Sequence, residues 1–151
     1  MHARQLLLLP LAALLLWATA ASAQPVGSVT ILSGMLVARG ADGAARVLAV
    51  NSQVREGDTL STQRNTYALV VFKDEAEVLL QPETTLVVTR YAYDADQPRQ
   101  DKVELGLEQG GLRSTAGKLA RRSAEATVIN TPVGALQGSA SMVVSLEPPR
   151  P

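Results

Sequence analysis

The chain has 151 residues, with 14 basic and 14 acidic side chains, one histidine and no cysteine. This balance gives no electrostatic reason to expect nucleic acid or an anionic membrane surface as a partner. The absence of cysteine excludes disulfides, thiolate chemistry and a lipid-anchored N-terminus.

The first 23 residues have the layout of a secretory signal peptide. A weakly positive start precedes a short apolar run over residues 6–17, and Ala21–Ala23 offers the small residues that a signal peptidase needs. A run of about a dozen residues is too short to span a bilayer, which takes about 20. We expect cleavage after Ala23, a mature chain that begins at Gln24 without a membrane span, and a periplasmic or secreted location.

The mature chain lacks the side chains that most enzymes need. The single histidine, His2, leaves with the signal peptide, so Ser-His-Asp and Cys-His catalysis and the usual zinc sites are excluded. No Gly-x-Ser-x-Gly or Gly-x-x-x-x-Gly-Lys motif occurs. Carboxylate chemistry of the glycosidase type stays open, but aromatic residues are only 3% of the chain and would make a poor sugar cleft. We expect no enzyme and no cofactor.

Short apolar alternations follow one another in the first half of the mature chain. Period two marks half-buried strands, and Asp42-Gly43 is a hairpin signal. The clearest unit is an antiparallel hairpin, in which residues 68–72 and 76–80 alternate on either side of a Lys73-Asp74-Glu75 turn. Further strands are predicted around residues 29–37, 47–50 and 54, with a turn at 56–58.

The second half of the chain continues this pattern with longer polar connections. Strands are predicted at residues 86–93, 103–107, 127–129 and 142–144. The polar stretches 94–102 and 114–125 are predicted loops, and 116–126 is the only helix candidate. Residues 147–151 contain three prolines and are predicted to be a frayed tail.

Turn signals therefore recur about every eight to twelve residues without a helical period, which predicts an all-β domain over residues 24–146. We expect an antiparallel sandwich or jelly-roll-like arrangement of short strands. A short β-solenoid or β-roll is the alternative.

The ordered turns and strands resemble the FecR domain, a periplasmic domain first described in iron-dicitrate signal transduction. The resemblance covers roughly residues 26–146. It is carried by Gly27-Ser28-Val29, Val54-x-x-Gly57-Asp58-x-Leu60-x-Thr62, Ala68-x-Val70-x-Phe72-x-Asp74, Val78-x-Leu80-x-Pro82, Leu107-x-x-Gly110-x-Leu112-Arg113, Gly117 and Thr131-Pro132.

The chain departs from the family in two ways. The family's closing Arg-Gly-Thr is replaced by Gln137-Gly138-Ser139, so a contact that needs a guanidinium fork is lost. The cytoplasmic segment and transmembrane helix of anti-sigma members have no counterpart here. The resemblance implies a free-standing periplasmic module for recognition or signalling.

The family markers also have structural interpretations, which we favour. Gly57, Gly110 and Gly111 suit positive φ or close backbone approach. Asp58 and Thr62 can bond backbone amides around a turn. Arg113 and Thr131 are markers without a further assigned role, and Pro132 is predicted to begin or end an edge strand.

Two surface groups are candidates for partner binding. Tyr91 and Tyr93 are two residues apart and would share one face of a strand, where their rings could stack on a sugar, unless one ring packs in the core. Lys118, Arg121 and Arg122 form a basic cluster that could meet an acidic partner, unless it is a solvated loop. The partner would be an unidentified envelope protein or a glycan such as peptidoglycan.

A metal site is not expected. Asp94, Asp96 and Asp101 suggest calcium, but an EF-hand loop needs Asp or Asn at its fifth position and Gly at its sixth. Pro98 and Arg99 stand there instead.

Overall fold

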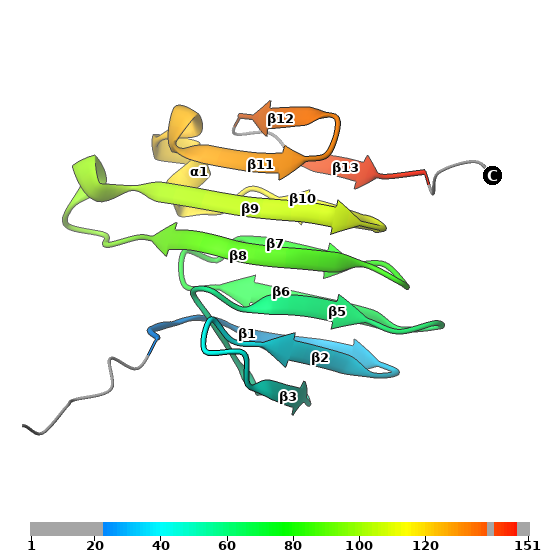
Figure 1. Ribbon diagram of the computed structural model, residues 1–151. Helices are drawn as coiled ribbons and strands as arrows, with labels where there is room; N and C mark the ends of the chain where they lie inside the picture. Colours follow the sequence, from blue (N-terminus) through cyan, green and yellow to red (C-terminus); the bar gives the residue numbers. More distant parts are fainter. Residues whose placement is uncertain (1–22, 139–140, 148–151) are drawn as a thin grey trace, which may run out of the picture.

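The computed structural model describes residues 23–138 and 141–147, which form two β-sheets packed face to face (Figure 1). In spatial order, sheet A consists of β13 (Met142–Ser145), β10 (Gly111–Thr115), β7 (Glu77–Leu80), β6 (Tyr67–Phe72), β1 (Pro25–Ser33) and β4 (Gln53–Arg55). Sheet B consists of β12 (Gly134–Gln137), β11 (Thr127–Thr131), β9 (Lys102–Gln109), β8 (Thr85–Ala92), β5 (Thr59–Thr62), β2 (Leu36–Arg39) and β3 (Ala45–Leu48). The predicted all-β sandwich is confirmed. The predicted signal peptide up to Ser22, Ser139 and the tail beyond Glu147 lie outside the described residues.

The chain advances along both sheets from one end to the other, as Figure 1 shows. Strands β3 and β4 form the edges at one end, and β12 and β13 form the edges at the other. This steady advance is the feature that the solenoid alternative predicts. All neighbouring strands are nevertheless antiparallel except β9 and β11, which run parallel, so the pairing is that of a sandwich.

The core lies between the sheets because alternate residues of the central strands point inward. In the β6–β7 hairpin, Ala68 pairs with Leu80 and Val70 pairs with Val78, and all four side chains are buried. The intervening residues face outward and are partly exposed. The period-two pattern therefore predicted both the hairpin and its buried face correctly.

The two polar stretches before β9 and after β10 contain the small amount of helix in the described chain. Helix α1 (Lys118–Arg122) is followed by a 3₁₀ turn, η2 (Ala124–Ala126), and another 3₁₀ turn, η1 (Pro98–Gln100), lies in the loop before β9. Leu119 of α1 is fully buried in the core. The segment predicted as a loop thus contributes an apolar side chain to the interior.

The glycines of the family markers are required by the backbone. Gly57 has φ +86°, and its N–H donates to the carbonyl of Val88 at 2.7 Å. Gly110 has φ +80°, and a Cβ there would lie 2.3 Å from the hydroxyl of Thr84. Both positions exclude larger residues, which supports the structural interpretation of these markers.

Candidate functional site

Two further markers, Asp58 and Thr62, hold turns together. Asp58 is buried and accepts two hydrogen bonds from the guanidinium of Arg46, at 2.8 and 3.2 Å, and one from the backbone N–H of Arg55. The hydroxyl of Thr62 donates to the carbonyl of Gln81 at 2.6 Å and accepts from the N–H of Thr84. These bonds tie neighbouring strands and turns to one another.

Thr131 and Pro132, the last two markers, lie in the β11–β12 hairpin, which forms one edge of sheet B. Thr131 ends β11, and its hydroxyl donates to the carbonyl of Gly134 at 2.7 Å. Pro132 occupies the turn and is exposed. It lies between the inner strand β11, which ends at Thr131, and the edge strand β12, which begins at Gly134, so it neither begins nor ends the edge strand itself.

The two tyrosines do not form an exposed sugar platform. Tyr91 is only 3% exposed, and its ring stacks on Phe72 with centroids 4.4 Å apart and planes 2° apart. The guanidinium of Arg122 covers Tyr93 at 4.8 Å from the ring centroid. Tyr91 is therefore a core residue, and the face of Tyr93 is already occupied.

The predicted basic cluster is engaged by neighbouring groups of the same chain. Lys118 forms an ion pair with Glu75 at 3.2 Å, and the guanidinium of Arg121 donates to the carbonyl of Gly117. Arg122 pairs with Asp101. The three side chains thus stabilise turns and offer no free cationic patch.

Asp101 and Arg122 close the loop that precedes β9. Arg122 donates to both carboxylate oxygens of Asp101, at 2.6 and 2.7 Å, and to the carbonyls of Asp94 and Ala95. The hydrogen bonds from Arg122 hold the pKa of Asp101 below its usual value, and the hydroxyl of Ser123 adds to this shift. Asp94, Asp96 and Asp101 are not gathered into a group of three potential metal ligands, and no such group occurs in the described chain.

This lowered pKa predicts a pH-dependent stability. A carboxyl group whose pKa is depressed by folding stabilises the native state above its unfolded pKa of about 3.9, and the effect is lost as pH falls through the folded pKa. We expect Asp101→Asn to lower the midpoint of thermal unfolding at pH 7, and the difference from the parent protein to shrink as the pH falls below the unfolded pKa of the carboxyl group. Calorimetry at pH 7 and at a series of lower pH values measures this. A difference that does not shrink as the pH falls would contradict the assignment.

A buried polar pair that the sequence did not predict lies at the other end of the Tyr91 ring. The Tyr91 hydroxyl donates to the carboxylate of Asp74, which is 1% exposed and also accepts from the N–H groups of Ala76 and Leu119. Burial, together with the nearby charge of Asp74, raises the pKa of Tyr91 far above its usual value. The phenol therefore stays protonated and acts as a fixed donor, which is a structural role.

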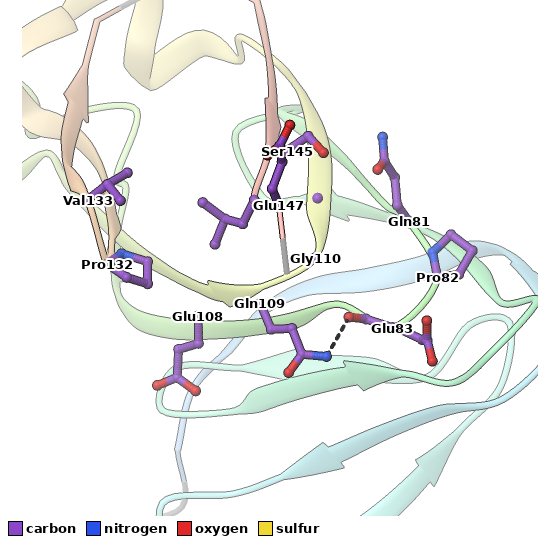
Figure 2. Close-up of a pocket in the computed structure, with 12 residues that line it drawn as sticks. Gln81, Pro82, Glu83, Glu108, Gln109, Gly110, Pro132, Val133, Ser145 and Glu147 are labelled. Carbon is purple, nitrogen blue, oxygen red and sulfur yellow. Dashed lines mark hydrogen bonds between the residues drawn. The ribbon is translucent and has the colours of Figure 1, made fainter. Parts of the chain in front are cut away.

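An open groove lies where the turns meet the β13 end of the sandwich (Figure 2). It has a volume of about 840 Å³, within the usual range for binding sites. Three carboxylates line it, from Glu83, Glu108 and Glu147, and none of its lining residues is basic. Its other lining residues are Gln81, Pro82, Gln109, Gly110, Gly111, Pro132, Val133, Ser145 and Leu146.

The sheet edges next to this groove differ from those at the opposite end. Edge strands β3 and β4 carry Arg46 and Arg55, and charged residues on an edge discourage pairing with another chain. Strands β12 and β13 carry no charged residue. Val143 of β13 is 61% exposed, and Val133 beside β12 is 88% exposed. We therefore take the β12–β13 end, with its groove, as the candidate functional site.

None of the helices in the described residues is long and apolar enough to cross a membrane. Comparison with known protein families, with curated proteins and with solved structures finds no match to this chain.

Proposed function

We propose that the chain is an exported, non-catalytic module of the FecR type that recognises a protein in the cell envelope. The observation that carries this proposal is the pair of uncharged strand edges at the β12–β13 end, which no strand of the described residues pairs with. Extended peptides commonly bind proteins by adding a strand to such an edge. The signal peptide predicted from the sequence and the resemblance of the markers to the FecR domain are the grounds for proposing an envelope location.

A glycan is the competing partner, and the geometry gives it less support. Recognition of sugars commonly uses exposed aromatic faces, and the predicted pair, Tyr91 and Tyr93, is packed against Phe72 and Arg122. Among the tyrosines of the described residues, this leaves the single ring of Tyr67, which is 51% exposed, rather than a platform of two rings. The test described next therefore includes an assay for glycan binding, whose positive result would count against the proposal.

The test compares purified protein in two assays. We expect a discrete protein to be captured from periplasmic extract, and no co-sedimentation with purified cell wall above that of an unrelated exported protein. N-terminal sequencing of the exported protein, with Gln24 as the first residue, checks the location. Cell-wall binding that is lost in Tyr93→Ala, together with no captured protein, would overturn the proposal. Tyr91→Ala is unsuitable because it would open the core.

A further inference from the structure

We infer that the outer face of sheet A is the interface of a symmetric dimer of this chain. The inference goes beyond the proposed function, because this face is distinct from the strand edges at the β12–β13 end. Three features carry it: central strands that are apolar on both faces, two exposed residues of opposite charge, and a pattern of side chains that matches itself about one two-fold axis.

The outer face of sheet A is more apolar than that of sheet B. An antiparallel sheet with one solvated face usually alternates apolar and polar residues. Sheet B follows this rule, because the outward residues where β5 and β8 pair are Thr59, Ser61, Thr85 and Val87. Sheet A departs from it, because the outward residues of β6 and β7 are Tyr67, Leu69, Val71, Glu77 and Leu79. Strands that are apolar on both faces are typical of a sheet that is covered on both sides.

The outward apolar residues form one patch. Ile31 of β1 pairs with Leu69 of β6, and Leu69 pairs with Leu79 of β7. Tyr67 lies two residues before Leu69 and therefore on the same face of the strand. Ile31 and Tyr67 are 60% and 51% exposed. Contiguous exposed apolar residues mark interaction surfaces, and tyrosine is enriched in such surfaces.

Two exposed charges border this patch. Glu77 of β7 and Arg113 of β10 lie diagonally across the two strands, because Leu79 pairs with Arg113 and Glu77 pairs with Thr115. Within the described residues, neither side chain has an ion pair or a hydrogen bond. Their charges are opposite, so Arg113 of one copy can pair with Glu77 of a second copy.

The positions of these residues fit one two-fold axis. The step from Ile31 to Tyr67 is one strand across and two residues along, and the step from Glu77 to Arg113 is the same. With about 4.8 Å between strands and about 3.4 Å per residue, the line through the midpoints of the two steps crosses both at close to 90°. An axis along this line places Arg113 against Glu77 of the second copy and Tyr67 against its Ile31.

The same axis brings the centres of the two patches together. It passes close to Leu69 and Leu79, so these leucines meet their counterparts in the second copy. The strands of the two copies would cross at roughly 70°, nearer to the orthogonal class of sheet packing than to the aligned one. Both the charges and the apolar contacts are thus complementary to the same face of another molecule. This self-complementarity selects a second copy as the occupant.

Charge exchange between two variants tests the interface. Arg113→Glu and Glu77→Arg each place like charges at both contacts, so each variant alone should dimerise at least about a hundredfold more weakly than the parent. An equimolar mixture should form a heterodimer, because every contact then joins an arginine to a glutamate. Arg99→Glu makes the same charge change in the exposed loop before β9 and is the control, which should leave the dimer unchanged.

A second variant tests the apolar part of the interface. Tyr67→Ala removes an exposed ring and should weaken the dimer at least about tenfold. Sedimentation equilibrium over a range of concentrations gives the dissociation constants of the parent and of each variant. Circular dichroism and urea unfolding establish that the variants fold. If a charge variant does not fold, Tyr67→Ala decides alone.

The expected result is a parent dimer that the charge variants and Tyr67→Ala weaken and that the mixture restores. Any of three results would overturn the inference. These are a parent protein that stays monomeric up to about 1 mM, a parent dimer that Tyr67→Ala leaves unchanged, and folded charge variants that stay monomeric when mixed. A dimer that Arg99→Glu weakens as much as Arg113→Glu does would also refute this face as the interface.

Discussion

Replacing Asp74 with alanine is expected to lower the free energy of unfolding by about 3–5 kcal/mol. Asp74 lies in the β6–β7 turn but is only 1% exposed, and its carboxylate accepts from Tyr91, Ala76 and Leu119. Alanine would leave the Tyr91 hydroxyl and the Leu119 N–H buried without an acceptor. Such a loss is a large part of the 5–15 kcal/mol that stabilises a typical domain.

Related variants separate the role of the carboxylate from that of its charge. Asp74→Asn keeps one oxygen for Leu119, and its amide can donate to the Tyr91 oxygen, so we expect a smaller loss. The double variant Asp74→Ala/Tyr91→Phe removes both partners and should cost less than the sum of the two single changes.

Urea unfolding measures these losses as shifts of the midpoint with an unchanged slope. Lys73→Ala, next to Asp74 but exposed, is the control and should change stability by less than about 0.5 kcal/mol. Additive single and double losses would contradict direct coupling between Asp74 and Tyr91.

The fold was largely predictable because its strands follow a local rule. Period two in residues 68–72 and 76–80 gave the hairpin, its turn and its buried face, and Asp42-Gly43 marked the β2–β3 turn. Each of these features depends on residues that are close in sequence. The order of strands in the two sheets depends on pairings between distant residues, so the edges that would be free could not be predicted from local patterns.

Tyr91 shows why a regular pattern failed at one position. In a regular strand, side chains alternate between the two faces, so with Val88 buried the side chain of residue 90 would face the core and that of Tyr91 would face solvent. A bulge between Val88 and Arg90 leaves both Thr89 and Arg90 exposed and turns Tyr91 inward, where it reaches Phe72 and Asp74. One extra residue thus reverses the faces of the rest of the strand.

The turn at Asp74 illustrates a second limit of sequence analysis. Lys73-Asp74-Glu75 was correctly predicted as a turn, and turn carboxylates are commonly solvated. Asp74 is buried because α1, 45 positions later, covers it and supplies the N–H of Leu119. A polar residue in a local turn can therefore be part of the core when a distant segment packs over it.

Asp58→Ala is expected to lower the free energy of unfolding by about 3 kcal/mol. Asp58 forms an ion pair with Arg46. The side chain of Asp58 is only 2% exposed, whereas that of Arg46 is 29% exposed. Removing the carboxylate frees the Arg55 N–H and detaches β3 from the β4–β5 turn. The loss is placed at the low end for a buried pair because Arg46 can turn toward water.

The partner side of the pair gives the comparison that decides this interpretation. Arg46→Met should cost more than Asp58→Ala, because it leaves the buried Asp58 carboxylate without its cation and with the Arg55 N–H as its remaining donor among the described residues, and Asp58→Ala/Arg46→Met should recover part of that loss. Asp42→Asn, in the adjacent exposed turn, is the control and should lie within about 0.5 kcal/mol of the parent. Equal stability of Asp58→Ala and the parent in urea unfolding would show that the Gly57-Asp58 marker is not required by the fold. A role for it in partner binding would then have to be considered, at the β3–β4 end and away from β13.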